Sequence, residues 1–151
     1  MHNRKSNPYM VHCVPTEMLD DAWPLVEDWI LAGMARAEPL GDIQQVREEI
    51  RQTRMQLWVV QAGQYLCAAF TTRVQQCPDA SYVECLHVGG QRVEEWLTLA
   101  VETVEEWATD AGAQYAKLRG RKGWQRKMAP LGYVPESVTL RKKLRDVREA
   151  H

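Results

Sequence analysis

The sequence lacks any long uninterrupted run of apolar residues, and its basic N-terminal residues 1–8 are not followed by the apolar stretch of a signal peptide. A membrane-spanning helix needs about 20 apolar residues, and a secretory signal needs an apolar segment after its charged end. We therefore expect a cytoplasmic protein without membrane contact. The cysteines Cys13, Cys67, Cys77 and Cys85 include no CxxC pair. This predicts free, buried, reduced thiols and no metal site.

Basic residues are scarce in the first three quarters of the chain. Residues 1–114 carry 8 Lys and Arg against 17 Asp and Glu, whereas residues 115–151 carry 11 against 3. A basic segment of this kind is typical of a surface for phosphates, nucleic acid or an acidic partner. A solvated basic face attracted to the acidic remainder would have the same composition, and both interpretations stay open.

Apolar periodicity and turn residues predict ten elements in one domain, residues 1–144, followed by a polar tail, residues 145–151. Expected strands cover residues 9–14, 56–61, 65–74, 81–88, 115–118 and 134–142; expected helices cover 16–37, 42–54, 93–111 and a short stretch near 124–131. This order predicts an α/β fold: a mixed, mostly antiparallel sheet of six strands, flanked by about four helices.

The last short helix is followed by Leu131-Gly132-Tyr133 and then by the sixth expected strand. Together with the element order, this motif resembles the GCN5-related N-acetyltransferase (GNAT) superfamily, as a divergent member. The resemblance implies acyl transfer from acetyl-CoA to an amine, with the cofactor held between the fourth strand and the next helix. It also implies an amine pocket shaped by residues 37–41.

The resemblance places the cofactor's pyrophosphate on the turn Val88, Gly89, Gly90, Gln91 and Arg92. Unpaired N–H groups and a helix N-terminus attract anions, and glycine allows close approach. The family's Arg-Gly-x-Gly-like run is replaced here by Val93-Glu94-Glu95. Two carboxylates in a first helical turn repel phosphate and satisfy the helix dipole themselves. We therefore interpret Glu94 and Glu95 as caps of the helix and the phosphate loop as degenerate.

Two further residues bear on catalysis. The resemblance implies a tyrosine as general acid at the position of Met128, and a glutamate on the fourth strand as general base, which would be Glu84. An exposed or partnered Glu84 without a catalytic role is the alternative. Strand alternation places Glu84 on the same face as Tyr82, Leu86 and Val88. Cys85 and His87 share the other face. For this pair, packing in the core is favoured over metal binding.

A dense basic cluster follows the fifth strand: Arg119, Arg121, Lys122, Arg126 and Lys127. It suits the 3′-phosphate of CoA, nucleic-acid phosphates or an acidic protein, and homo-oligomers remain open. Residues 120–124 also resemble segments of small tailed-phage proteins, which implies a virion-associated setting. Two functions follow: a non-canonical or catalytically inactive GNAT-fold binding protein, or an active acyl-CoA-dependent N-acetyltransferase.

Overall fold

The computed structural model describes residues 7–37, 41–120, 122–137 and 140–144. The chain divides into two compact units, residues 1–121 and residues 122–151, and each is described by itself. The tail predicted over residues 145–151 lies outside the described residues, and a single domain over residues 1–144 stays a prediction.

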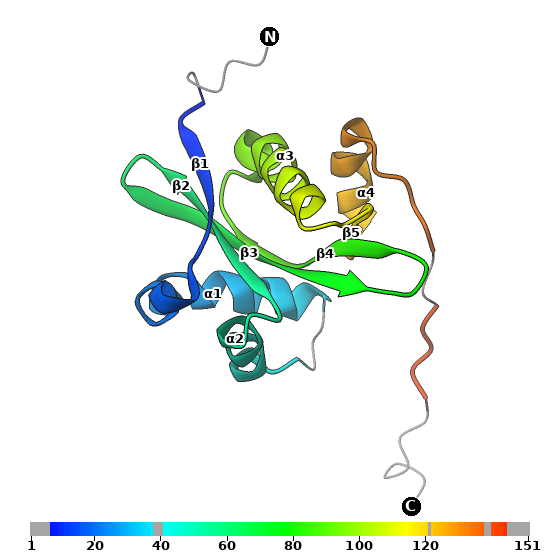
Figure 1. Ribbon diagram of the computed structural model, residues 1–151, viewed down its shortest axis with the longest axis horizontal. Helices are drawn as coiled ribbons and strands as arrows, with labels where there is room; N and C mark the ends of the chain where they lie inside the picture. Colours follow the sequence, from blue (N-terminus) through cyan, green and yellow to red (C-terminus); the bar gives the residue numbers. More distant parts are fainter. Residues whose placement is uncertain (1–6, 38–40, 121, 138–139, 145–151) are drawn as a thin grey trace, which may run out of the picture. The chain divides into compact units, whose positions relative to one another are not determined.

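The first unit contains the sheet and three helices (Figure 1). Its elements are β1 (Tyr9–Cys13), the 3-10 turn η2 (Thr16–Met18), α1 (Leu19–Ala37), α2 (Ile43–Arg51), β2 (Gln56–Ala62), β3 (Tyr65–Gln76), β4 (Ser81–Gly90), α3 (Val93–Asp110) and β5 (Tyr115–Leu118). None of the described helices is both long and apolar enough to cross a membrane.

The strands form one sheet in the order β1-β2-β3-β4-β5. The first four pair antiparallel, and β5 pairs parallel to β4. Gly63, at φ +61°, makes the tight turn between β2 and β3, as its place in the sequence predicts. The predicted mixed, mostly antiparallel sheet is therefore confirmed, and so are four helices, but in the part of the chain that the structure describes the sheet has five strands rather than six.

The sixth strand, expected over residues 134–142, is wrong for the part that can be described. Residues 134–137 and 140–142 form no strand, and residues 138–139 lie outside the described residues. Val134 and Leu140 are more than four-fifths exposed, so the alternating apolar side chains bury nothing there. Pro135 lacks the N–H that a ladder needs, and this weakens pairing where the strand would begin.

Two hydrophobic cores form on the two faces of the sheet. Helices α1 and α2 cover one face and α3 covers the other (Figure 1). Alternation along β2 feeds both cores, because Leu57 and Val59 face α1 whereas Trp58 and Val60 face α3. On the α3 side Trp58 stacks on Phe70 and meets Trp107 edge to face, with ring centroids 5.9 and 5.4 Å apart.

Local signals explain where the helices begin and end. The side chain of Asp42 caps α2 by accepting the N–H of Gln44 at 2.9 Å. Gly112, at φ +91°, follows the end of α3, as its position predicts. Pro24 lies within α1, and the helix continues through it.

The second unit contains α4 (Lys122–Met128) and a 3-10 turn, η3 (Ala129–Leu131). Gly132, at φ +92°, ends that turn and donates its N–H to the Ala129 carbonyl at 3.0 Å. The predicted short helix before Leu131-Gly132-Tyr133 is therefore present. Within α4, the ammonium group of Lys127 lies 5.3 Å from the centroid of the Trp124 ring.

Candidate functional site

The connection between β4 and α3 is short. β4 runs to Gly90 and α3 begins at Val93, so only Gln91 and Arg92 join them. Gly89 and Gly90 are strand residues paired with Ala69 and Ala68 of β3, not members of a loop. Of the five residues predicted to hold a pyrophosphate, three therefore lie in the sheet.

Gly89 packs directly against the backbone of α1. A Cβ at this position would lie 2.0 Å from the carbonyl oxygen of Trp29 and 2.6 Å from its carbonyl carbon. On the helix side, a Cβ at Gly33 would lie 2.7 Å from the backbone nitrogen of Val88. Two glycines, one on each element, thus let α1 lie on β4 at backbone-to-backbone distance.

Gly90 packs in the same way against β3. Its φ is +129°, and a Cβ there would lie 2.4 Å from the Cα of Ala68 and 2.5 Å from the carbonyl oxygen of Cys67. Cys67 is the extra residue of a β-bulge, since Val60 opposes Ala68 and Gln61 opposes Leu66. Its carbonyl accepts the N–H of Gln91 at 2.9 Å. One amide of the predicted phosphate site is therefore used within the fold.

Arg92 has the left-handed backbone that glycine prefers, at φ +61° and ψ +36°. For a non-glycine residue this conformation costs about 1–2 kcal/mol, so other contacts must hold it. The Tyr9 phenol of β1 donates to the Glu95 carboxylate at 2.9 Å and also hydrogen-bonds Arg92. Burial and the Glu95 acceptor raise the pKa of Tyr9, and the contacts with Tyr9 and Glu95 raise the pKa of Arg92.

The cluster of Tyr9, Arg92 and Glu95 occupies the start of α3. The Glu95 N–H donates to the Arg92 carbonyl at 2.9 Å, and the Trp96 indole donates to the Gln91 carbonyl at 2.7 Å. Glu95 reaches across to β1 rather than capping its own helix, which differs from the expected capping role. A negative charge therefore already lies near Arg92 at this turn.

The sheet opens beside the second half of β4. β5 pairs only with residues 82–85, so residues 86–90 of β4 have no strand on that side among the described residues. Strand edges of this kind present unpaired backbone N–H and C=O groups. The opening lies next to the β4–α3 junction, where the resemblance to acetyltransferases places a cofactor.

A second β-bulge lies in β4. Thr71 opposes His87 and Thr72 opposes Cys85, so Leu86 is the extra residue. Because of this bulge, the alternation of side chains between the two faces of β4, which the sequence predicts, is wrong beyond Leu86. Cys85 faces the α3 core, while buried His87 hydrogen-bonds the Thr71 hydroxyl at 2.8 Å on the α1 side.

The same bulge turns Val88 to the α3 face, away from Leu86, which packs on the α1 side. The prediction that Glu84 and Val88 share a face is therefore wrong. Burial, with the neighbouring Glu84, raises the pKa of the Cys85 thiol to about 12, so this thiol stays protonated and unreactive at neutral pH. No group of three His, Cys, Asp or Glu side chains suited to a metal ion occurs in residues 7–37, 41–120, 122–137 and 140–144.

Glu84, the candidate base, is 13% exposed and lies 3.8 Å from the guanidinium of Arg119. Its register neighbours are also cations, Arg73 on β3 and Lys117 on β5. The partnered glutamate expected as the alternative is thus present. The Glu84 side chain is therefore engaged by a cation in this structure. A catalytic role for Glu84 stays a prediction.

The predicted basic cluster is divided between the two units. Arg119 belongs to the first unit and pairs with Glu84, while Arg126 and Lys127 are exposed on α4. Arg121 lies outside the described residues, as does the side chain of Lys122. Residues 38–40 of the expected amine pocket are likewise not described. Met128, at the position of the expected tyrosine, is buried.

Sequence reasoning missed Tyr9. Nothing in a strand of five residues, 86 positions before Glu95, indicates a hydrogen bond to the start of α3. The left-handed Arg92 was also missed, because such a conformation is normally signalled by Gly or Asn. The two β-bulges have no sequence signal of their own either.

The fold defined by this sheet and these helices is that of the acetyltransferases of the GNAT type. Comparison with solved structures gives an aminoglycoside acetyltransferase from an uncultured soil metagenomic sample, with a TM-score of 0.65, 10% identity and coverage of 93% of this chain and 99% of that one. Glucosamine-6-phosphate N-acetyltransferase from Arabidopsis thaliana gives 0.64, 11% identity, and 91% and 99%.

A third solved structure, AAC(6')-Iy in complex with the bisubstrate analogue CoA-S-monomethyl-acetylneamine, has a TM-score of 0.66 and 14% identity, covering 91% of this chain and 99% of that chain. No family model matches the chain, and no curated protein matches it in sequence. The predicted GNAT-like fold is therefore confirmed, in a chain whose sequence differs widely from those of these structures.

Proposed function

We propose that this chain is a non-catalytic binding protein built on the acetyltransferase fold. The observation that supports this proposal is the two-residue connection between β4 and α3. Next to it, Gly89 packs against the backbone of α1 and Gly90 against that of β3. Anion binding at a helix N-terminus needs free amides and close approach. Here Gln91 donates to Cys67, and the first turn of α3 contains the acidic residues Glu94 and Glu95.

Titration calorimetry with acetyl-CoA tests this proposal. We expect no heat of binding at millimolar cofactor, for the native chain and for Arg92→Glu alike. Micromolar binding that Arg92→Glu abolishes would instead make the junction a working cofactor site and remove the proposal. Circular dichroism of Arg92→Glu establishes that the variant is folded, because Arg92 also contacts Tyr9.

The basic C-terminal part is the proposed binding surface. Arg126 and Lys127 are exposed on α4, and residues 115–151 carry 11 basic against 3 acidic residues. Nucleic acid and an acidic protein surface are both compatible with this charge. Retention on a single-stranded DNA column distinguishes them, since phosphate contacts make binding depend steeply on salt. A virion setting stays a prediction.

A matched pair of variants makes the column experiment specific. Arg126→Glu and Arg36→Glu change the net charge equally, and both positions are exposed. If α4 binds phosphate, Arg126→Glu reduces the dependence of log affinity on log salt by about one, and Arg36→Glu does not. Equal effects of the two variants would indicate attraction by net charge only.

An active N-acetyltransferase is the second candidate function. The opening beside residues 86–90 of β4 favours it, because it leaves strand-edge hydrogen-bonding groups next to the α3 N-terminus. Release of free CoA from acetyl-CoA in the presence of primary amines measures the activity. For an active enzyme with Glu84 as base, Glu84→Gln lowers the rate by about 10²–10⁴.

A further inference from the structure

Helix α1 and the turn before it carry a second row of apolar side chains besides the core face. Met18, Ala22, Leu25, Trp29 and Ala32 follow one another at intervals of 4, 3, 4 and 3 residues. This spacing places them along one strip of the helix, as in the seam of a coiled coil. The core residues Leu19, Val26 and Ile30 lie one position later, on the adjoining face. We call the first row the α1 stripe.

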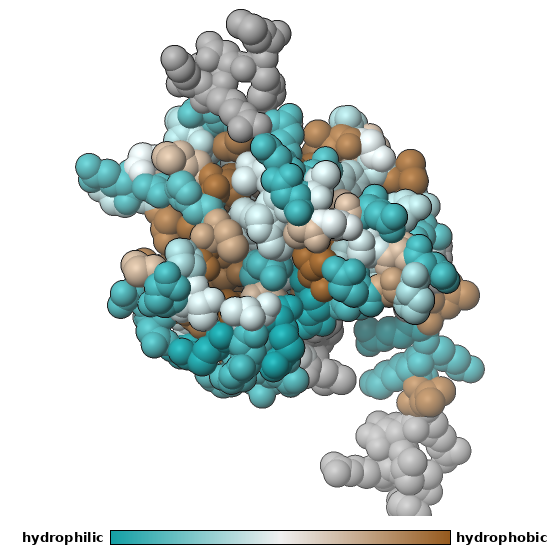
Figure 2. Space-filling view, in the orientation of Figure 1, coloured by the Kyte–Doolittle hydropathy of each residue, from teal (hydrophilic) through white to brown (hydrophobic). Residues whose placement is uncertain are grey.

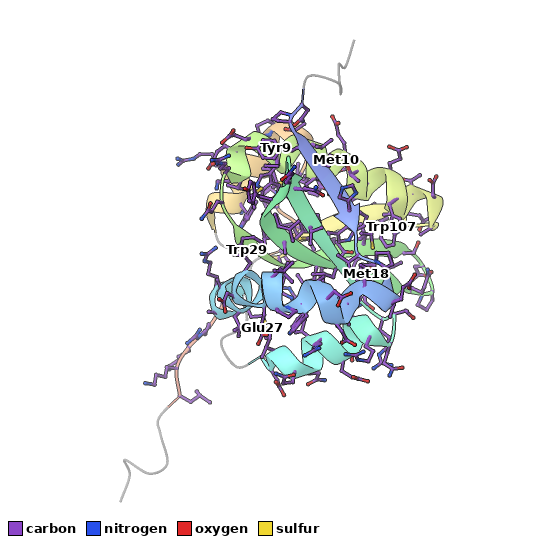
Figure 3. All side chains as sticks on the ribbon, turned by 90° about the vertical axis from the view of Figure 1, so that its left-hand side faces the viewer. Tyr9, Met10, Met18, Glu27, Trp29 and Trp107 are labelled. Atoms are coloured by element: carbon purple, nitrogen blue, oxygen red, sulfur yellow. The ribbon has the colours of Figure 1, made fainter. Side chains whose placement is uncertain are left out.

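The α1 stripe is exposed at two of its five residues, and Trp29 also packs against the α1-side core. Leu25 is 64% exposed and Met18 is 48% exposed, while Ala22, Trp29 and Ala32 are half-buried. Apolar surface gathers on the same side of the unit, between β1 and the start of α1 (Figure 2). In Figure 3 Met18 and Trp29 lie on the side of α1 toward β1, which carries the exposed Met10, and Glu27 lies on the opposite side. Contiguous apolar surface of this kind marks an interaction site.

Acidic residues border the stripe. Glu17, Asp21 and Asp28 are exposed along its outer edge, on the side away from the core. No Lys or Arg occurs in residues 7–35 or 56–72, so the stripe itself carries no positive charge, and the first cation along the strip is Arg36, four residues after Ala32. A second copy docked through the same stripe would place these acids against acids. Charge complementarity therefore favours a basic partner.

We propose that the α1 stripe binds a basic amphipathic helix of another protein. Apolar side chains of that helix, spaced three and four residues apart, face the stripe, and its Lys or Arg residues face Glu17, Asp21 and Asp28. The stripe spans 14 residue steps, about 21 Å of helix, so the partner contributes about four turns. This site uses neither the β4–α3 junction nor α4, and it does not depend on the function proposed above.

Two synthetic peptides of equal length test the proposal on the full chain. Both carry leucines at 3–4 spacing; one has lysines at the flanking positions and the other has glutamates. We expect micromolar binding of the lysine peptide by calorimetry and at least tenfold weaker binding of the glutamate peptide. Equal affinity for both, or no binding of either at millimolar peptide, would overturn the proposal.

Matched variants on the same helix locate the site. Leu25→Lys is expected to weaken the lysine peptide at least tenfold, whereas Leu31→Lys, at another exposed leucine outside the stripe, leaves it unchanged. Asp28→Lys should shift preference toward the glutamate peptide, and Glu27→Lys should not. Equal loss in Leu25→Lys and Leu31→Lys would place the site elsewhere.

Sedimentation of the chain alone tests whether a second copy of the chain occupies the α1 stripe. A concentration-dependent dimer that Leu25→Lys converts to monomer would make a second copy the occupant and overturn the basic helix. Circular dichroism confirms folding of each variant. Since the acetyl-CoA and DNA-column experiments use Arg92 and Arg126, their failure is separable from failure here.

Discussion

Replacing Gly89 by alanine separates a packing role of this glycine from a cofactor-binding role. The added Cβ would lie 2.0 Å from the Trp29 carbonyl oxygen, about 1.4 Å short of the 3.4 Å at which ordinary contact begins. The obstructing atoms belong to the backbone, so no side-chain rotation can relieve the overlap, and α1 must move away from β4. Overpacking costs about 1–3 kcal/mol, and more where the surroundings are rigid.

We expect Gly89→Ala to lower the free energy of unfolding by about 3 kcal/mol and the Tm by roughly 6–12 °C. Urea denaturation followed by tryptophan fluorescence measures the change. Gly63→Ala is the control: its φ is also unfavourable for alanine, but nothing lies within 4 Å of its Cβ, so the cost is only about 1–2 kcal/mol. The packing argument would be refuted if Gly89→Ala had native stability but no longer bound acetyl-CoA. Gly89 would then be a cofactor-binding residue.

Two further predictions concern polar contacts. The Thr72 hydroxyl accepts from the buried Trp58 indole and donates to Gln56, both at 2.9 Å, so Thr72→Val should cost about 1–3 kcal/mol in urea denaturation, while Thr103→Val, on α3, stays within about 0.5 kcal/mol. Arg51 and Arg47 hold the pKa of Asp20 below its usual value. Its stabilising effect is therefore present above about pH 4 and is lost as pH falls through the lower folded value. Asp20→Asn should therefore destabilise more at pH 7 than at pH 2, as thermal melts at both pH values would reveal.

The regular part of the fold was predictable because its signals are local. Alternation identified β2 and β3, the apolar face and Gly112 identified α3, and the side chain of Asp42 marked the start of α2. These features depend on neighbours within a few residues, where propensity and capping act directly. The order of elements then restricted the topology to a few alternatives, of which the observed fold is one.

The junction was not predictable, because its geometry depends on residues far apart in the sequence. Gly89 and Gly90 were assigned to a loop since glycine is disfavoured in strands. The backbone of α1, some 60 positions earlier, leaves no room for a Cβ at Gly89, and β3 leaves none at Gly90. The bulge at Leu86 similarly adds one residue without changing composition, and it reversed the faces inferred for Val88 and His87.

The stability of the first unit depends little on the β4–α3 junction. The two cores lie on either face of β2 and β3, and most of their large side chains, such as Trp23 and Trp58, are remote from the β4–α3 turn. A fold held in this way tolerates variation at the turn where Tyr9, Arg92 and Glu95 meet. If the junction binds no anion, as proposed, these contacts supply the stabilisation that a bound anion would otherwise supply. The two surfaces proposed to bind partners, α4 and the α1 stripe, lie outside this junction.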